Sequence, residues 1–129
     1  MGSATNKPDH HRQYEGRYAL DNTEGVRRLL ADYHALKQRR FAGDNAASDI
    51  LIDLQTAIER AGLTDRQRQA MHLVYGEDLT QTDAGERMGV SKQTVNRLIN
   101  VASAKVAQVY ESWCRRGEGY VLSEREDAE

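Results

Sequence analysis

The 129-residue chain has little of what builds disulfide-rich, all-β or membrane proteins. Its single cysteine, Cys114, excludes an intrachain disulfide framework and fits a reducing cytoplasm. One proline and 6% aromatic residues argue against a sandwich or barrel, which needs many turns and much aromatic or β-branched surface. No apolar run approaches the roughly 20 residues that cross a bilayer, and residues 1–20 lack the apolar segment of a secretory signal. We therefore expect a cytoplasmic protein with no membrane partner.

The chain also lacks a strong net charge. It has 18 Lys and Arg against 20 Asp and Glu, a net of −2, whereas nucleic-acid binders are usually basic. The charge is unevenly spread: residues 1–61 carry a net of zero, residues 62–117 a net of +2 and residues 118–129 a net of −4. The excess acid thus lies in the last dozen residues, and DNA binding by residues 62–117 is not excluded. Because +2 is small, we expect weak non-specific affinity.

The N-terminal part is predicted to hold a flexible arm and two helices. Residues 1–20 are polar and poor in aliphatic residues, as is typical of an arm. A helix is expected from Asp21 to about Phe41, because Asp21 and Glu24 have capping-box spacing and apolar residues recur at helical spacing, namely Val26, Leu29, Leu30, Tyr33 and Leu36. A second helix is expected over residues 46–61, with Gly62 as its C-cap. Residues 21–61 are interpreted as a two-helix segment.

Three further helices are predicted over residues 62–116. They begin after Thr64, Thr80 and Ser91, which suit helix N-caps, and end near residues 75, 88 and 114. The capping-box pairs are Thr64 with Gln67 and Thr80 with Asp83. Residues 117–129 follow as an acidic tail. The fold is therefore predicted to be all-α, with about five helices and no strand.

Residues 81–98 match a helix-turn-helix by residue type. Two helices that cross steeply need small residues at the crossing, and Ala84 and Gly85 supply them. Gly89 suits a turn with positive φ. Apolar residues that would hold the second helix lie beside the turn and on that helix, at Met88, Val90, Val95 and Leu98. An ordinary helical hairpin with a polar outer face is the alternative.

The helix after this turn is expected to present polar and basic side chains outward: Lys92, Gln93, Thr94, Asn96 and Arg97. In the major groove Arg and Lys fit guanine, while Asn and Gln fit adenine. No acidic residue occurs between Lys92 and Gln108, which suits a helix that approaches phosphates. The pattern predicts a DNA-binding helix-turn-helix with a long recognition helix.

Residues 63–109 resemble region 4 of the sigma-70 family, the bacterial sigma-factor domain that binds the promoter −35 element. The likeness is carried by LTDRQRQA at residues 63–70, Gly76, LTQTDAG at residues 79–85 and GVSKQTV at residues 89–95. Small sigma-like regulators of late transcription in phages and prophages are the most similar members. The resemblance implies that this part of the chain binds promoter DNA.

The resemblance also implies roles for single residues. Base reading falls to Lys92, Gln93 and Arg97. Phosphate or other DNA contacts fall to Arg66, Thr80, Gln81 and Lys105, and we add Ser91, Thr94 and Asn96 from their place on the recognition helix. The first helix of the unit would face the flap of the RNA polymerase β subunit.

We therefore expect a sequence-specific DNA-binding regulator of transcription and no enzyme. Its expected partners are double-stranded DNA and RNA polymerase, and it would act as a monomer or as a homodimer through spare apolar positions such as Val101. Residues 20–61 are too short and too poor in aromatics for promoter melting. Two alternatives remain: a polymerase-binding co-regulator or anti-sigma-like protein with little DNA binding, and a DNA-packaging subunit.

No motif for a cofactor, a metal or catalysis is present. The chain lacks a P-loop, a dinucleotide fingerprint, a zincin motif and a nucleophile elbow. His34 and His72 stand alone on helices, without partners at metal-ligand spacing. Cys114 is expected to pack at a helix end, and Trp113 to cover the core. The remaining open question concerns the basic residues Arg27, Arg28, Lys37, Arg39 and Arg40, which either extend a binding surface or form a solvated helix face.

Overall fold

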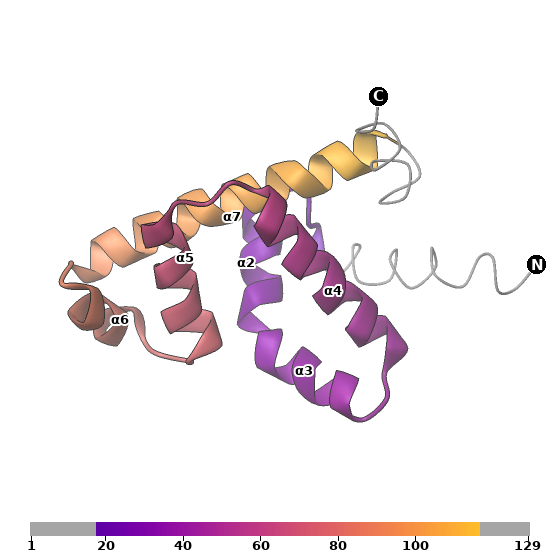
Figure 1. Ribbon diagram of the computed structural model, residues 1–129, viewed down its shortest axis with the longest axis horizontal. Coiled ribbons are helices and arrows are strands. Elements are labelled where there is room, and N and C mark those ends of the chain that lie inside the picture. Colours follow the sequence, from indigo (N-terminus) through magenta and orange to yellow (C-terminus); the bar gives the residue numbers. More distant parts are fainter. Residues whose placement is uncertain (1–17, 117–129) are drawn as a thin grey trace, which may run out of the picture.

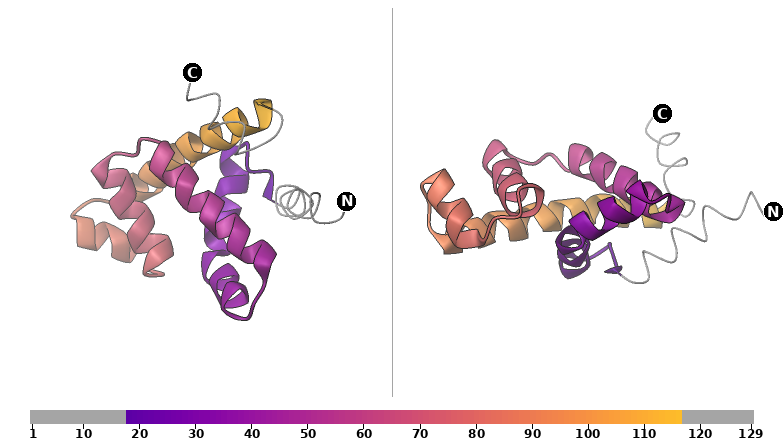
Figure 2. Two further views of the ribbon diagram at one scale, coloured as in Figure 1. Left: turned by 45° about the vertical axis from the view of Figure 1, so that its right-hand side comes forward. Right: turned by 90° about the horizontal axis from the view of Figure 1, so that it is seen from below.

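The computed structural model describes residues 18–116, which are all-helical and contain no strand. The longest helix, α7 (Lys92–Arg115), runs along one side of the molecule (Figure 1). Short helices pack beside its N-terminal half, and a second group crosses its C-terminal half (Figure 2). In chain order the other elements are α2 (Thr23–Ala31), α3 (Tyr33–Phe41), α4 (Asn45–Arg60), α5 (Asp65–Met71), the π-helical turn η1 (His72–Gly76) and α6 (Gln81–Met88). No described helix is both long and apolar enough to cross a membrane.

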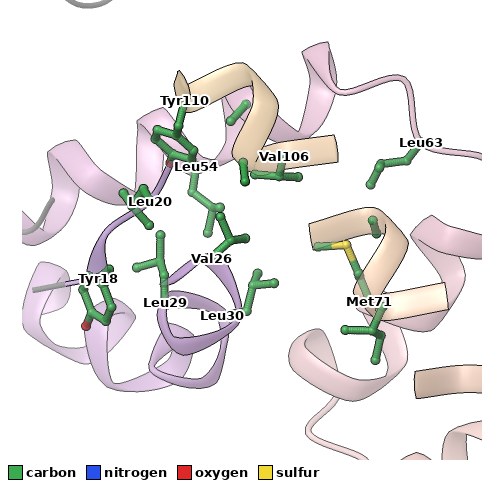
Figure 3. Close-up of a cluster of buried hydrophobic side chains, with 14 of the residues drawn as sticks. Tyr18, Leu20, Val26, Leu29, Leu30, Leu54, Leu63, Met71, Val106 and Tyr110 are labelled. Carbon is green, nitrogen blue, oxygen red and sulfur yellow. The ribbon is translucent and has the colours of Figure 1, made fainter. Parts of the chain in front are cut away.

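One contiguous core joins the two groups of helices. Val26 and Leu29 of α2 are fully buried and lie in the same cluster as Val106 and Tyr110 of α7 (Figure 3). Tyr110 also packs edge-on against Trp113, with ring centroids 5.2 Å apart, so Trp113 covers the core as predicted. The N-terminal helices therefore pack against the C-terminal half of α7.

The all-helical class is confirmed, but the N-terminal segment has three helices where two were predicted. The expected helix from Asp21 to Phe41 is broken at Asp32, whose ψ of 8° departs from helical geometry. The Tyr18 hydroxyl donates to Asp32 Oδ2 at 2.8 Å, and the break lets α3 turn back to pack on α4. The N-cap is also Asn22, not Asp21, because the Asn22 side chain accepts from the Gly25 amide.

The structure bears on three further predictions, which concern the N-terminal arm, the acidic tail and Cys114. Tyr18 and Leu20, assigned to the arm, are buried at 2% and 3% exposure. Residues 1–17 of the predicted arm and the predicted acidic tail lie outside the described residues. Cys114 is exposed, so its expected packing role is wrong: α7 turns Trp113 inward and the next residue outward.

The predicted N-caps of the C-terminal helices are confirmed, although the described contacts contain only the Thr80 half of the predicted Thr80–Asp83 capping box. Thr64 and Gln67 form both halves of the capping box that opens α5. Thr80 caps α6 and Ser91 caps α7, each by accepting a backbone amide three residues on. The helix predicted to run to residue 75 changes at Met71 from α-helix to the π-helical turn η1. These caps set the positions at which α6 and α7 begin.

Candidate nucleic-acid interface

The turn between α6 and α7 is closed by a tight backbone approach. The Val90 amide donates to the Gly85 carbonyl at 2.9 Å, and a Cβ added to Gly85 would lie 2.7 Å from the Val90 carbonyl oxygen. Ala84 beside it is fully buried. Gly89 has φ of +72°, the left-handed conformation that favours glycine. The small residues thus allow the crossing that the sequence predicted, and the ordinary hairpin is not needed to explain them.

Apolar side chains fix which face of α7 turns outward. Met88 and Val95 are buried, and Val90 and Leu98 are half-buried against the core. Residues on the opposite side of the first three turns of α7 must therefore face solvent, because a helix repeats every 3.6 residues.

The predicted base-reading residues share this outward face. Lys92, Gln93 and Arg97 are exposed. With Gln81, Asn96 and Asn100 they line one shallow hollow. The first acidic residue of α7 is Glu111, more than four turns from its start. The N-terminal half of α7 therefore offers a basic and amide-rich surface with no carboxylate of its own.

The smaller polar residues of the predicted interface act locally at helix starts. The hydroxyls of Thr80 and Ser91 accept the capping bonds of α6 and α7. Ser91 Oγ also lies 3.0 Å from Thr94 Oγ1 and donates to it. Gln81 Nε2 donates to Asn96 Oδ1 at 3.3 Å, which links the first turn of α6 to the second turn of α7. These bonds order both helix starts on the same side as the exposed basic residues.

The structure separates Lys105 from the other predicted contacts. Arg66 of α5 is exposed and its Nη2 donates to the Met88 carbonyl at 3.5 Å, so its guanidinium lies at the end of α6, near the turn. Lys105 is half-buried and donates to Gln67 Oε1 at 3.1 Å. Lys105 lies on α7, eight residues beyond Arg97, and its side chain faces α5. The structure therefore does not bring Lys105 together with the base-reading residues.

One residue of the N-terminal segment joins the site. Arg27 of α2 is half-buried, and its guanidinium donates to Asn100 Oδ1 at 2.7 Å and to Asn96 Oδ1 at 3.3 Å. The sequence named Arg27 only among several basic residues of undecided role. Its separation from Asn96 by 69 residues leaves no local pattern that could have singled it out.

Comparisons with known proteins find similarity over the same stretch of the chain. Residues 61–108 match the family model of sigma-70, region 4. A UPF0251 protein of Syntrophobacter fumaroxidans is 43% identical over 53 residues, which are 41% of this chain and 34% of that protein. UPF0251 proteins of Thermococcus kodakarensis and Pyrococcus furiosus are 49% and 47% identical over 47 residues, which are 36% of this chain and 42% and 44% of those proteins. No solved structure matches.

Residues 61–108 form a sigma-70 region 4-like helix-turn-helix domain. The predicted resemblance to sigma-70 region 4 is thereby confirmed, and the domain is of a DNA-binding kind. The chain spans less than half the length of the curated relatives it matches. Their names make no reference to phages, so the narrower likeness to phage regulators stays a prediction. Among residues 18–116, no group of three or more His, Cys, Asp and Glu is placed to hold a metal ion.

Proposed function

We propose that this protein is a sequence-specific DNA-binding regulator of transcription that inserts the N-terminal half of α7 into the major groove. The observation that carries the proposal is the shared exposure of Lys92, Gln93 and Arg97 on a helix face without carboxylates. Lys and Arg at such positions suit guanine, and Gln suits adenine. Arg66, Thr80, Gln81, Ser91 and Thr94 would hold phosphates and orient the helix, and Asn96 would make a further DNA contact. Lys105, which bonds Gln67 of α5, would lie outside this interface.

The electrostatics favour a regulator that shares its hold on DNA with a partner. Residues 62–117 carry a net charge of only +2, and non-specific affinity for DNA rises with the number of phosphates that a protein neutralises. The base contacts made by one short helix face would therefore add to only a weak non-specific affinity for DNA. A second contact that brings the protein to the promoter would raise its effective concentration there.

RNA polymerase is the partner that we propose, through a hollow between the N-terminal helices and α5. The hollow has a volume of about 420 Å³. Its apolar lining includes Leu30, Tyr33, Leu51, Ile58, Met71 and Tyr75, with Arg40 and Arg68 among its basic residues. With Glu59 as the one carboxylate among its described lining residues, such a surface suits an amphipathic segment with an acidic flank. The sigma resemblance implies that the first helix of the unit, which is α5, faces the flap of the β subunit.

Two experiments test the two halves of the proposal. Selection of random duplexes with the full chain, followed by gel shifts over a salt series, should yield one consensus sequence. A pull-down with core RNA polymerase should capture the protein, and Tyr75→Ser should weaken capture. Phe41→Ser is the matched control, because Phe41 is 97% exposed and lies outside the hollow.

The results separate the DNA-binding regulator from the co-regulator. Capture by polymerase without binding to any duplex at low salt contradicts DNA reading and favours the interaction protein. A selected consensus without polymerase capture supports an autonomous DNA binder and removes the polymerase contact from the proposal.

A further inference from the structure

Arg27 couples the N-terminal helices to the DNA-facing side of the region 4-like domain. Its two guanidinium nitrogens bridge Asn96 and Asn100, which lie one turn apart on α7. Both amides line the hollow that also contains Lys92 and Arg97. Helix α2 therefore contacts the proposed DNA-binding surface as well as the buried side of α7.

The two hydrogen bonds determine which amide atoms remain available to a ligand. The Oδ1 atom of Asn96 accepts from Arg27 Nη2 and from Gln81 Nε2, both at 3.3 Å. A carbonyl oxygen has two lone pairs, so this acceptor is fully used. Asn100 Oδ1 accepts from Arg27 Nη1 at 2.7 Å. What Asn96 still offers outward is its Nδ2 group, which can only donate.

A donor-only amide has a restricted choice of partners on DNA. An asparagine that reads adenine must accept from the adenine N6 amino group while donating to N7. Asn96 lacks the free acceptor for that pair. Its Nδ2 donors instead match phosphate oxygens, guanine O6 and N7, or thymine O4.

The Arg27 guanidinium also places a positive charge next to the two amides that it holds. Arginine stays protonated under all ordinary conditions. In the described part of the chain its hydrogen-bond partners are the two neutral amides, and no carboxylate pairs with it. The neighbouring Arg28, by contrast, is exposed and pairs with Glu24 at 3.9 Å. Arg27 therefore differs from Arg28, the other basic residue of α2.

We infer that Arg27 is a positioning residue for DNA recognition, which holds Asn96 as a hydrogen-bond donor and suppresses adenine at the base pair that Asn96 faces. The inference rests on the proposed function. It gives the N-terminal helices a role in sequence preference, beyond their packing on α7.

The test is selection of random duplexes by the full chain, comparing the wild type with Arg27→Met. Methionine keeps an unbranched stem but removes the donors, so one lone pair of Asn96 Oδ1 becomes free to accept. The expected result is an enrichment of adenine on the order of tenfold at one position of the consensus, the discrimination of one bidentate pair. In the double variant Arg27→Met with Asn96→Ala, this enrichment should disappear.

Arg28→Met is the matched control and should select the wild-type consensus, because Arg28 touches neither amide. If Arg27→Met does not fold, Gln81→Met decides the question, because it removes the other donor from Asn96 Oδ1 and should also enrich adenine. An unchanged consensus in the folded variants, whatever the change in affinity, overturns the inference alone. If the wild type selects no sequence at all, the proposed function fails and the inference with it.

Discussion

Gly85 of α6 and Val90 of the following turn approach so closely that a single added carbon would not fit between them. A Cβ on Gly85 would lie 2.7 Å from the Val90 carbonyl oxygen, closer than ordinary van der Waals contact allows. The same two residues share the hydrogen bond from the Val90 amide to the Gly85 carbonyl. The direction in which α7 leaves the turn, and hence the placement of its reading face, depends on this approach.

Gly85→Ala should destabilise the fold even though alanine is the better helix former. The helix preference would stabilise by up to about 1 kcal/mol, but a displaced backbone at a packed crossing costs about 1–3 kcal/mol. We expect a net loss of about 1–2 kcal/mol in the free energy of unfolding, measured by urea denaturation. Glu86→Ala, at the next and exposed residue, is the control and should be near neutral. Wild-type stability in Gly85→Ala would show that the turn can relax.

Tyr18→Phe should loosen the break between α2 and α3. The Tyr18 hydroxyl is the described side-chain donor to Asp32, at 2.8 Å, and the ring that carries it is 2% exposed. Removing the hydroxyl keeps the apolar packing and deletes the bond, so we expect a loss of about 1 kcal/mol in thermal or urea unfolding. Tyr33→Phe is the comparison, since the Tyr33 ring is half-buried and its hydroxyl makes no described hydrogen bond. Equal effects from both substitutions would remove Asp32 from the explanation.

Local chemistry explains why the C-terminal helices were predictable. The capping box of Thr64 and Gln67 and the left-handed Gly89 act within three residues of where they stand, so their residue types predict them. The exposed face of α7 likewise follows from the burial of Val95 and Ile99, which the helical period places opposite it. The family resemblance covers the same stretch.

The rest depends on contacts between distant residues, which a single sequence does not reveal. No glycine or proline marks the break at Asp32. The side chain that bonds Asp32 there is Tyr18, fourteen residues earlier and in a segment expected to be a loose arm. Arg27 and Arg28 are adjacent residues of the same type, yet of the two only Arg27 makes a described hydrogen bond to α7. The position of Lys105 opposite the reading face becomes evident only once α5 is seen to pack on α7.

Arg97→Ala should weaken specific DNA binding and relax the preference at one base pair. Arg97 is exposed on the reading face, and a base-reading arginine contributes about 1–3 kcal/mol of discrimination. The measurement is fluorescence anisotropy with the selected duplex and with its single-base variants at fixed salt. A uniform loss for all duplexes would assign Arg97 to phosphate contact instead.

Arg66→Ala should weaken binding to all duplexes alike and reduce its salt dependence. Arg66 belongs to α5, its side chain reaches the Met88 carbonyl at the end of α6, and the sigma resemblance implies that it contacts a phosphate. Loss of one such contact should lower the slope of log affinity against log salt by about 0.9. The slope is measured by anisotropy titrations between low and physiological salt. A changed base preference with an unchanged slope would contradict the phosphate role.

Lys105→Met should lower stability and leave the salt slope of DNA binding unchanged. Lys105 Nζ donates to Gln67 Oε1, the same oxygen that accepts from the Thr64 amide in the capping box of α5. Methionine keeps the stem that packs between α5 and α7 but cannot donate, so we expect a loss of about 0.5–1.5 kcal/mol in urea unfolding. Lys92→Met, at an exposed reading position, should show the reverse: unchanged stability and weaker DNA binding. A fall in the slope by about one unit for Lys105→Met would restore the phosphate contact that the sequence predicted.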